Sequence, residues 1–264
     1  MSEAPLLAAV GVTYTYPAGP IALDHVDVEI ARGERLALLG GNGSGKSTLL
    51  LLLNASLKPA TGAVRLNGRN VGWSRRDRNQ HRRRVGLVLQ DPDDQLFSAS
   101  VFEDVSFGPL NLGLDEVAAR QRVEEMLDRL GLIELAERPA HLLSFGQRKR
   151  VAIAGVAAMR PEVVLLDEHF AGLDPTARHE VMATLDQLEA DGATVALATH
   201  NVDLAYGWAD RVVVLADGTV AAAGPPATVL HDAERCAAAR LRRPGLVDLL
   251  DAAVDAGWLE QPEA

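Results

Sequence analysis

The sequence predicts an α/β protein built on a mostly parallel β-sheet with helices on both faces. Two observations carry this prediction. A glycine-rich stretch at residues 40–48 lies between a short apolar segment and a helix-forming one, as at the junction of a buried strand and a helix. From residue 144 to residue 215, helix-like segments alternate with apolar strand-like ones. This alternation is typical of parallel sheets whose strands are connected by helices.

Composition indicates a globular protein of moderate size. The chain has 264 residues, of which 48% are apolar, and a formal net charge of −10. An acidic chain is a poor general partner for nucleic acid or for an anionic membrane surface. The single cysteine, Cys236, gives no disulfide framework and indicates a reducing compartment. Residues 1–10 lack a signal-peptide pattern, and no segment has the ~20 apolar residues of a membrane helix, so we expect other chains to hold the protein at any membrane.

The first ninety residues read mainly as short strands. Residues 6–14 and 24–30 predict two strands, with turns at 17–20 and 32–33. Residues 60–90 hold more short strands around Asn67-Gly68, a hairpin-like pair. Six arginines lie between residues 75 and 84. We favour a solvated helix face or loop over a phosphate or nucleic-acid contact here, because no aromatic residues are interleaved.

The second half alternates helices and strands. Three segments have helical periodicity: 115–131, which Asp115 can cap, 144–159 and 176–190. Four apolar segments predict strands: 162–167, 195–199, 211–215 and, after a tight turn at Asp217-Gly218, 219–223. Beyond residue 226 the tail turns helical, with apolar residues at helical spacing: Leu246, Leu249, Leu250, Ala253 and Val254. We favour a helix that caps the domain; a partner or dimer contact is the alternative.

Residues 40–48 fit the G-x-x-x-x-G-K-[ST] pattern of a phosphate-binding loop in full. The glycines let backbone N–H groups turn inward, and the following helix N-terminus adds partial positive charge. We expect Lys46 to reach the β- and γ-phosphates and the Ser47 hydroxyl to face Mg²⁺. The alternative, a glycine-rich turn without a ligand, does not account for the lysine and hydroxyl. The expected nucleoside triphosphate contacts are Gly40, Gly41, Asn42, Gly43, Ser44, Gly45, Lys46, Ser47 and Thr48.

Two acids follow a fully apolar strand. Asp167 and Glu168 come after four apolar residues, at the strand end where α/β sheets bind ligands. Asp167 would hold Mg²⁺ through its water shell, and Glu168 would polarise an attacking water as a general base. A solvated acidic turn is the alternative, and the phosphate loop upstream weakens it.

A capping box precedes the helix at 144–159. Ser144 is followed three residues later by Gln147, the spacing of reciprocal helix capping. This pattern is sufficient for a plain helix start. The same N-terminus, with Gly146, can also offer N–H and O–H donors to a γ-phosphate.

Taken in order, the motifs resemble those of the ATP-binding-cassette ATPase family over about residues 6–225. The ordered set is Tyr16, 40–48, Gln90, 143–147, Asp167-Glu168, 172–174 and His200. Residues 89–97 and 107–113 look like the ATPase subunits of energy-coupling-factor importers, most closely the cobalt/nickel type, and residues 143–155 point the same way.

This resemblance implies a fold and a domain division. The fold is a P-loop NTPase (RecA-like) core with a mostly parallel sheet, an N-terminal antiparallel β subdomain and an inserted α-helical subdomain. The implied divisions are an ATPase domain over residues 1–225, its helical subdomain at about 91–160, and a C-terminal helical extension over 226–264. The implied cofactors are ATP and Mg²⁺.

The resemblance also implies residue roles. Tyr16 would stack on adenine, with Tyr14 as the fallback, and His200 would touch the γ-phosphate. Gln90 would contact Mg²⁺ and the attacking water and sense the membrane partner. Asp174 would couple the two sites of a dimer. The remaining implied contacts, to the γ-phosphate of ATP held by the opposite subunit, are Ser144, Gly146 and Gln147. The expected catalytic residues are Glu168, His200, Gln90 and Lys46, and the expected magnesium contacts are Ser47, Gln90 and Asp167.

Two departures from the family pattern stand near these residues. Phe145 occupies a position where glycine is usual, which removes backbone freedom at the expected dimer contact. His169 and Phe170 occupy positions where a proline and a small hydroxyl residue are usual. They leave open the path of the loop from Glu168 to Asp174.

The implied function is the ATP-hydrolysing motor of a membrane importer for cobalt or nickel ions, powered by ATP-driven head-to-tail dimerisation. The implied partners are a transmembrane coupling subunit, a substrate-binding membrane subunit and a second copy or a related ATPase chain, with no nucleic acid. The chain would lie peripherally on the cytoplasmic face of the cell membrane. The alternatives are the ATPase of a vitamin importer or another transporter and, with less support, a soluble ATPase of this family acting on nucleic acid or ribosomes.

Two further features of the sequence concern the transported substrate and the membrane partner. The seven histidines are scattered, so no metal-ligand cluster is expected and the transported substrate would be chosen by another chain. Asp91, Asp93 and Asp94 form a local acidic cluster. This cluster would suit a basic coupling helix, or else forms an ordinary solvated loop.

Overall fold

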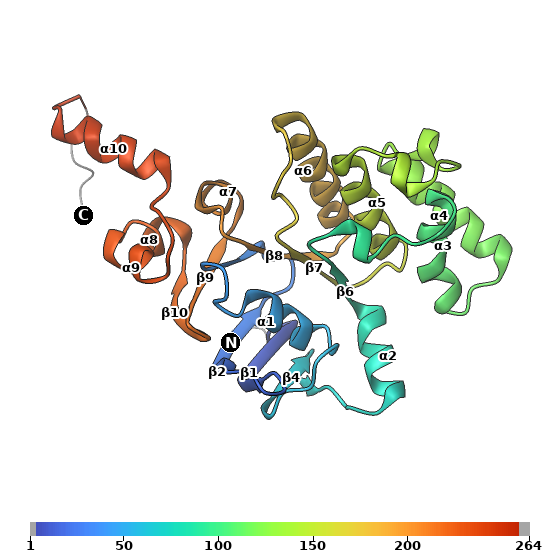
Figure 1. Ribbon diagram of the computed structural model, residues 1–264, viewed down its shortest axis with the longest axis horizontal. Coiled ribbons are helices and arrows are strands. Elements are labelled where there is room, and N and C mark those ends of the chain that lie inside the picture. Colours follow the sequence, from blue (N-terminus) through green and yellow to red (C-terminus); the bar gives the residue numbers. More distant parts are fainter. Residues whose placement is uncertain (1–3, 259–264) are drawn as a thin grey trace.

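The computed structural model describes residues 4–258, which form two β-sheets surrounded by helices (Figure 1). The larger sheet has the strand order β10-β9-β3-β8-β7-β6. Its strands are β3 (Leu36–Leu39), β6 (Val85–Val88), β7 (Val163–Asp167), β8 (Thr194–Thr199), β9 (Arg211–Ala216) and β10 (Thr219–Gly224). Of these six, β10 alone runs antiparallel to its neighbour. The predicted mostly parallel sheet is confirmed.

The smaller sheet comes from the first seventy residues and is antiparallel, as predicted. Its order is β2-β1-β4-β5, with β1 (Leu7–Thr15), β2 (Ile21–Ile30), β4 (Thr61–Leu66) and β5 (Arg69–Asn70). The expected hairpin joins β4 to β5. Asn67 and Gly68 both have positive φ, 50° and 74°, which is the geometry of a two-residue hairpin turn.

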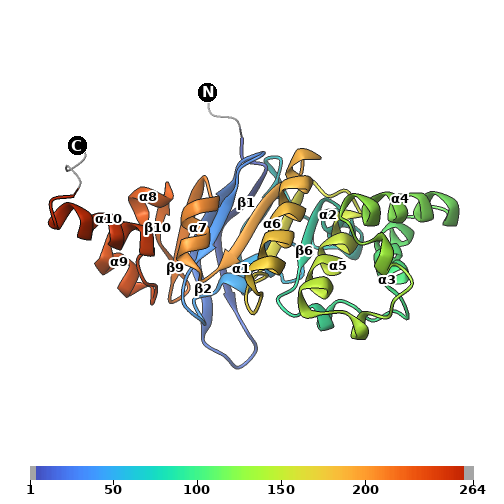
Figure 2. The ribbon, with the colours of Figure 1, turned by 90° about the horizontal axis from the view of Figure 1, so that it is seen from above.

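Ten α-helices and several short 3₁₀ turns occupy the described residues. The helices are α1 (Lys46–Leu53), α2 (Arg75–Arg84), α3 (Val101–Asn111), α4 (Glu116–Arg129), α5 (Phe145–Ala157), α6 (Pro175–Ala190), α7 (Val202–Trp208), α8 (Pro226–Val229), α9 (Ala233–Ala238) and α10 (Gly245–Asp255). Figure 2 shows α3 and α4 at one end of the molecule and α10 at the other. Helices α3 and α7 were not predicted from the sequence.

The large sheet is buried on both faces, which explains why its strands are apolar at every position. Along β7, Val163 and Leu165 face a core shared with α1 and the small sheet. Val164 and Leu166 face a second core that contains α5, α6 and α7. Because α1 is packed between the two sheets, the loop before it is fixed from both sides.

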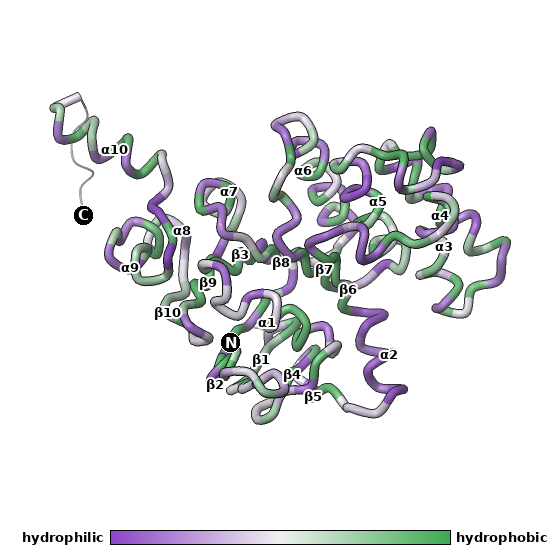
Figure 3. The backbone as a smooth tube through the Cα atoms, viewed as in Figure 1, coloured by the Kyte–Doolittle hydropathy of each residue, from purple (hydrophilic) through white to green (hydrophobic). Residues whose placement is uncertain are grey.

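Helix α2 carries the six arginines and is hydrophilic along its length (Figure 3). Ser74 and Asp77 form a capping box at its start. Its one buried residue, His81, places Nε2 at 2.6 Å from the Leu53 carbonyl oxygen. The helix is therefore a largely solvated face anchored at one point, in agreement with the reading favoured from the sequence.

Helix α10 differs from expectation in the direction of its leucines. Leu246, Leu249 and Leu250 are exposed, and Val247 is the buried residue of this helix. The leucine face therefore does not cap the domain within one chain. The boundaries 1–225, 91–160 and 226–264 remain predictions, and residues 1–3 and 259–264 lie outside the described part. Within residues 4–258 no helix is both long and apolar enough to cross a bilayer.

Candidate active site

Three parallel strands deliver the predicted site residues to one edge of the large sheet. The glycine-rich loop follows β3, Asp167 and Glu168 stand at the end of β7, and His200 follows β8. Because β3 pairs with β8 and β8 with β7, their carboxyl ends are adjacent. Such edges are where open α/β sheets bind ligands.

The loop at residues 40–45 has the backbone of a phosphate cradle. Gly43 and Gly45 have φ of 80° and 103°, values that side chains with a Cβ disfavour. A Cβ on Gly40 would lie 2.4 Å from both the Leu215 carbonyl oxygen and Ser44 Oγ. Gly45 begins α1 without a side-chain cap, so the first N–H groups of the helix are free to bind an anion. The loop therefore fits the phosphates of a nucleotide.

A cleft of about 500 Å³ opens over this loop. It is lined by residues 42–48, Gln90, Glu168, residues 20–22 and Tyr16. The Tyr16 hydroxyl lies 3.3 Å from Thr48 Oγ1, and the ring packs edge-on against Tyr14 with centroids 5.0 Å apart. The structure thus places Tyr16 where a flat base could stack. Residues 20–22, at the start of β2, were not predicted to line the site.

Glu168 lies between a cation and an imidazole. Its Oε1 is 3.3 Å from Lys46 Nζ, and its Oε2 is 2.9 Å from His200 Nδ1. Lys46 also donates hydrogen bonds to the carbonyl oxygens of Gly40 and Gly41, at 2.8 and 3.2 Å. The Glu168 carboxylate is buried at the cleft wall, where it can accept a proton from a bound water.

Asp167 offers an unsatisfied oxygen at the end of β7. Its Oδ1 is buried and makes no hydrogen bond. Burial raises the pKa of Asp167, and a hydrogen bond from the Ser47 hydroxyl opposes this rise. A buried orphan carboxylate oxygen beside a hydroxyl is a donor set that suits Mg²⁺. The residues present therefore fit a magnesium ion shared with nucleotide phosphates. Within residues 4–258 no group of three or more His, Cys, Asp or Glu side chains could hold a metal on its own.

The Ser144 segment forms the predicted capping box at the start of α5. The Gln147 N–H donates to Ser144 Oγ at 3.2 Å, and the Ser144 N–H donates to Gln147 Oε1 at 3.0 Å. Gly146 is required by a close approach, because a Cβ there would lie 2.8 Å from the Cβ of Ala177 on α6. Asp174 caps α6, accepting from the Ala177 N–H at 2.9 Å.

These residues stand apart from the phosphate cleft. Ser144, Gly146, Gln147 and Asp174 are absent from the described residues that line it. One chain therefore brings together the phosphate loop, Gln90, Glu168 and His200, and does not bring the Ser144 segment to them. Sequence reasoning also missed Lys149, which lies behind Glu168 and is described below.

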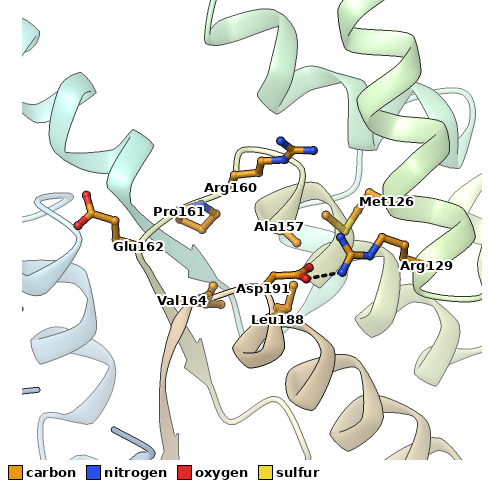
Figure 4. Close-up of a pocket in the computed structure, with 11 residues that line it drawn as sticks. Met126, Arg129, Ala157, Arg160, Pro161, Glu162, Val164, Leu188 and Asp191 are labelled. Carbon is orange, nitrogen blue, oxygen red and sulfur yellow. Dashed lines mark hydrogen bonds and ion pairs between the residues drawn. The ribbon is translucent and has the colours of Figure 1, made fainter. Parts of the chain in front are cut away.

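A second hollow, of about 460 Å³, lies beside the start of β7 and the end of α6 (Figure 4). Arg129 and Asp191 from its lining form an ion pair, and Arg160 pairs with Glu125 outside it. Glu162 pairs with Arg32 and Arg84, so each charged group of the lining has an ion-pair partner. The hollow shares no lining residue with the phosphate cleft.

Comparison with known proteins decides the family. Residues 23–171 match the family model described as ABC transporter, which is more than half of the chain. The chain belongs to the ATP-binding-cassette family. It is an ATP-binding ATPase of the ABC type, as the ordered motifs predicted.

The relatives of this ABC ATPase agree with the resemblance to energy-coupling-factor ATPases. A cobalt import ATP-binding protein, CbiO of Rhodobacter capsulatus, is 54% identical over 93% of this chain and 88% of its own. The energy-coupling factor transporter ATP-binding protein EcfA of Methanothermobacter thermautotrophicus is 45% identical over 94% of this chain and 79% of its own.

Solved structures confirm the fold. The cbiO1 structure from Clostridium perfringens, described as part of the ABC transporter complex cbiONQ, has a TM-score of 0.80 at 42% identity, with coverage of 94% of this chain and 99% of that one. The dimeric cassette MJ0796 bound to ADP and phosphate has a TM-score of 0.75 at 29% identity, covering 83% and 98%.

Proposed function

We propose that this ABC ATPase is the motor subunit of a membrane importer for cobalt or nickel ions. The observation that supports this choice of substrate is the 54% identity of the chain, over nearly its whole length, with a protein named as a cobalt import ATP-binding protein. The arrangement of Lys46, Glu168 and His200 at the phosphate cleft supports the hydrolytic step that would drive import.

Hydrolysis follows from the geometry of the cleft. Glu168 orients and deprotonates a water for attack on the γ-phosphate, with His200 holding the carboxylate from the other side. Negative charge that develops on the phosphoryl oxygens is stabilised by Lys46 and by the N-terminus of α1. Ser47, Gln90 and Asp167 would hold Mg²⁺, which neutralises phosphate charge when bound.

The complete site requires two chains. Ser144, Gly146 and Gln147 stand at a helix start that does not line the cleft of their own chain, yet their donors suit a γ-phosphate. Of the three, Ser144 is exposed. A head-to-tail pair places this helix start over the phosphate loop of the partner. The dimeric MJ0796 cassette supports such pairing. Because ATP is shared across the interface, its hydrolysis opens the dimer.

A groove of about 420 Å³ suits the membrane partner. Phe97 and Phe107 line it with their rings 5.1 Å apart, and both are exposed, Phe97 by 68%. Asp94 adds a carboxylate to its lining. Asp93 is engaged by Arg148 at 3.0 Å, and Asp91 accepts from the Asp93 N–H, so only part of the acidic cluster remains for a partner. An apolar helix with basic residues would fit this surface.

The test is recovery of the tagged chain from gently solubilised native membranes, with its partners identified by mass spectrometry. We expect a transmembrane coupling protein and a small metal-binding membrane subunit, with no second ATPase. A vitamin-binding subunit would retain the motor and overturn the substrate. Ribosomal or DNA-bound proteins alone would overturn the transporter assignment.

A further inference from the structure

A lysine is buried behind the active site. Lys149, in the first half of α5, is 1% exposed, the largest of the fully buried side chains. Within residues 4–258 its amine forms no ion pair with a carboxylate. A buried, unpaired ammonium group is costly unless other polar groups replace its water shell.

Three backbone carbonyl groups replace that water. Lys149 Nζ donates to the carbonyl oxygens of His169 at 2.7 Å, Ala171 at 3.0 Å and Glu168 at 3.4 Å. Burial lowers the pKa of Lys149 to about 8, so the protonated amine with three N–H donors prevails at neutral pH. Each donor thus has one acceptor, and all three acceptors lie in the turn that begins at the proposed catalytic base.

The contact is reciprocal. His169 Nε2–H donates back to the Lys149 carbonyl oxygen at 3.0 Å, and the His169 side chain is fully buried. The centroid of the Phe145 ring lies 4.9 Å from Lys149 Nζ, so the amine also contacts an aromatic face. Helix α5 and the turn at 168–171 are therefore joined from both sides.

The turn holds Glu168 in a backbone conformation that glutamate disfavours. Glu168 has φ of +42°, in the left-handed region. For a residue with a Cβ this region is unfavourable and persists only where the surroundings impose it. The Ala171 N–H donates to the Glu168 carbonyl oxygen at 3.2 Å, and Lys149 fixes the same carbonyl group.

We propose that Lys149 is a positioning residue for ATP hydrolysis, which holds the 168–171 turn so that the Glu168 carboxylate stays between Lys46 and His200. The inference rests on the proposed role of Glu168 as the base. The proposal also links the two ATP sites of a dimer. Lys149 contacts the turn of its own site, and Ser144, at the start of the same helix, is expected to contact the ATP of the partner chain.

The two departures from the family pattern belong to this arrangement. A glycine at position 145 would remove the ring that contacts the amine of Lys149. A proline at position 169 would have no side-chain donor for the Lys149 carbonyl group. A Cβ on Gly172 would lie 3.4 Å from Phe145 Cε1, so the same ring also supports the path of the loop toward Asp174.

The test compares Lys149→Met, which keeps the length and removes the donors, with Lys149→Gln, which restores two N–H groups. We expect kcat of the Met variant to fall about 10²-fold, as for a small displacement of a reacting group, with KM for ATP unchanged. The Gln variant should recover part of kcat. A purely structural role would not separate kcat from KM.

Arg150→Met is the matched control, because Arg150 is next on α5 and binds Glu180 and the Leu130 carbonyl group rather than the turn. It should keep the kcat of the wild type. A Lys149→Met protein with wild-type kcat, or one whose loss equals that of Arg150→Met, overturns the proposal. If the Met variant does not fold, the Lys149→Gln variant, whose side chain is shorter, decides the question. A wild-type kcat in that variant overturns the proposal, and a reduced kcat with unchanged KM supports it. Glu168→Gln, assayed in parallel, separates the two hypotheses: turnover by that variant would refute the base itself.

Discussion

At the scale of single residues, Glu168 has two partners with different effects. Lys46 is buried and contacts one carboxylate oxygen at 3.3 Å, whereas the exposed imidazole of His200 contacts the other at 2.9 Å. Glu168 itself is 7% exposed. This combination suits a base that must stay ionised until a bound water presents its proton.

Glu168→Gln removes the proton acceptor and keeps the shape of the side chain. We expect ATP turnover to fall by about 10³-fold, within the range of general-base contributions, and ATP to hold the chain as a dimer. Phosphate release and light scattering with Mg²⁺ and ATP measure the two effects. The control is Glu162→Gln, which replaces a glutamate that precedes β7 and pairs with Arg32 and Arg84. It should leave ATP turnover and dimerisation unaltered.

His169 makes the stability of the protein depend on pH. Burial lowers the pKa of His169 to about 4, whereas in the unfolded chain it is near 6.5. Between these values the unfolded state binds more protons, so stability is complete above pH 6.5 and is lost as the pH falls toward 4.

Between pH 7 and pH 5 this group should remove about 2 kcal/mol from the free energy of unfolding. Urea unfolding at both pH values measures the loss. His169→Gln keeps an N–H donor and cannot titrate, so its loss should be smaller by that amount. Equal losses in the two proteins would show that His169 does not remain neutral in the folded chain.

At the scale of elements, helix starts were easier to predict than helix interiors. Ser144 and Asp115 cap α5 and α4 as their sequence spacing indicates. Helix α3 escaped prediction because Gly108 and Pro109 normally interrupt helices. In the structure a Cβ at position 108 would lie 2.7 Å from Met159 Cγ, so that glycine serves the packing of α3 and not a turn.

The active site was predictable to the extent that its residues lie in local motifs. The phosphate loop and the two acids after β7 are contiguous patterns, and their meeting follows from parallel strands. Lys149 could not be found this way, because it lies between Arg148 and Arg150 and reads as part of a solvated basic run. Its burial depends on the turn at 168–171, twenty residues away, which no local pattern indicates.

A further prediction at the scale of elements concerns the groove that Phe97 and Phe107 line. Phe97→Ala removes an exposed ring from the proposed docking surface and should reduce recovery of membrane partners about 10-fold, as for an aromatic anchor at an interface. Quantitative mass spectrometry of the recovered complex measures this. Val117→Ala, on α4, removes exposed apolar surface outside the lining of the groove and is the control. Equal recovery from both variants would place the membrane contact elsewhere.

At the scale of the whole molecule, we propose that each chain supplies two different half-sites to a dimer. The cleft holds the phosphate loop and Glu168, whereas Ser144 and Gly146, at the start of α5, are not among the residues that line it. A pair related by two-fold symmetry brings together two such sites, each with one half from either chain. Chains defective in different halves should therefore rescue one another.

Lys46→Ala and Ser144→Ala proteins test this arrangement. Each alone should hydrolyse ATP poorly, because each homodimer has the same defect in both sites. An equal mixture should regain about a quarter of the wild-type sites, since half of the dimers are mixed and each has one intact site. Phosphate release before and after mixing measures the gain. If the mixture shows only the mean of the two proteins, hydrolysis does not use half-sites from two chains.

The left-handed backbone of Glu168 has a consequence for laboratory evolution. Asparagine and glycine tolerate φ of +42° better than glutamate does, so an inactive chain with either residue at position 168 would fold more favourably. A selection for heat resistance alone would thus enrich variants that lack the proposed base. Libraries built on this protein should be screened for turnover before they are ranked by melting temperature.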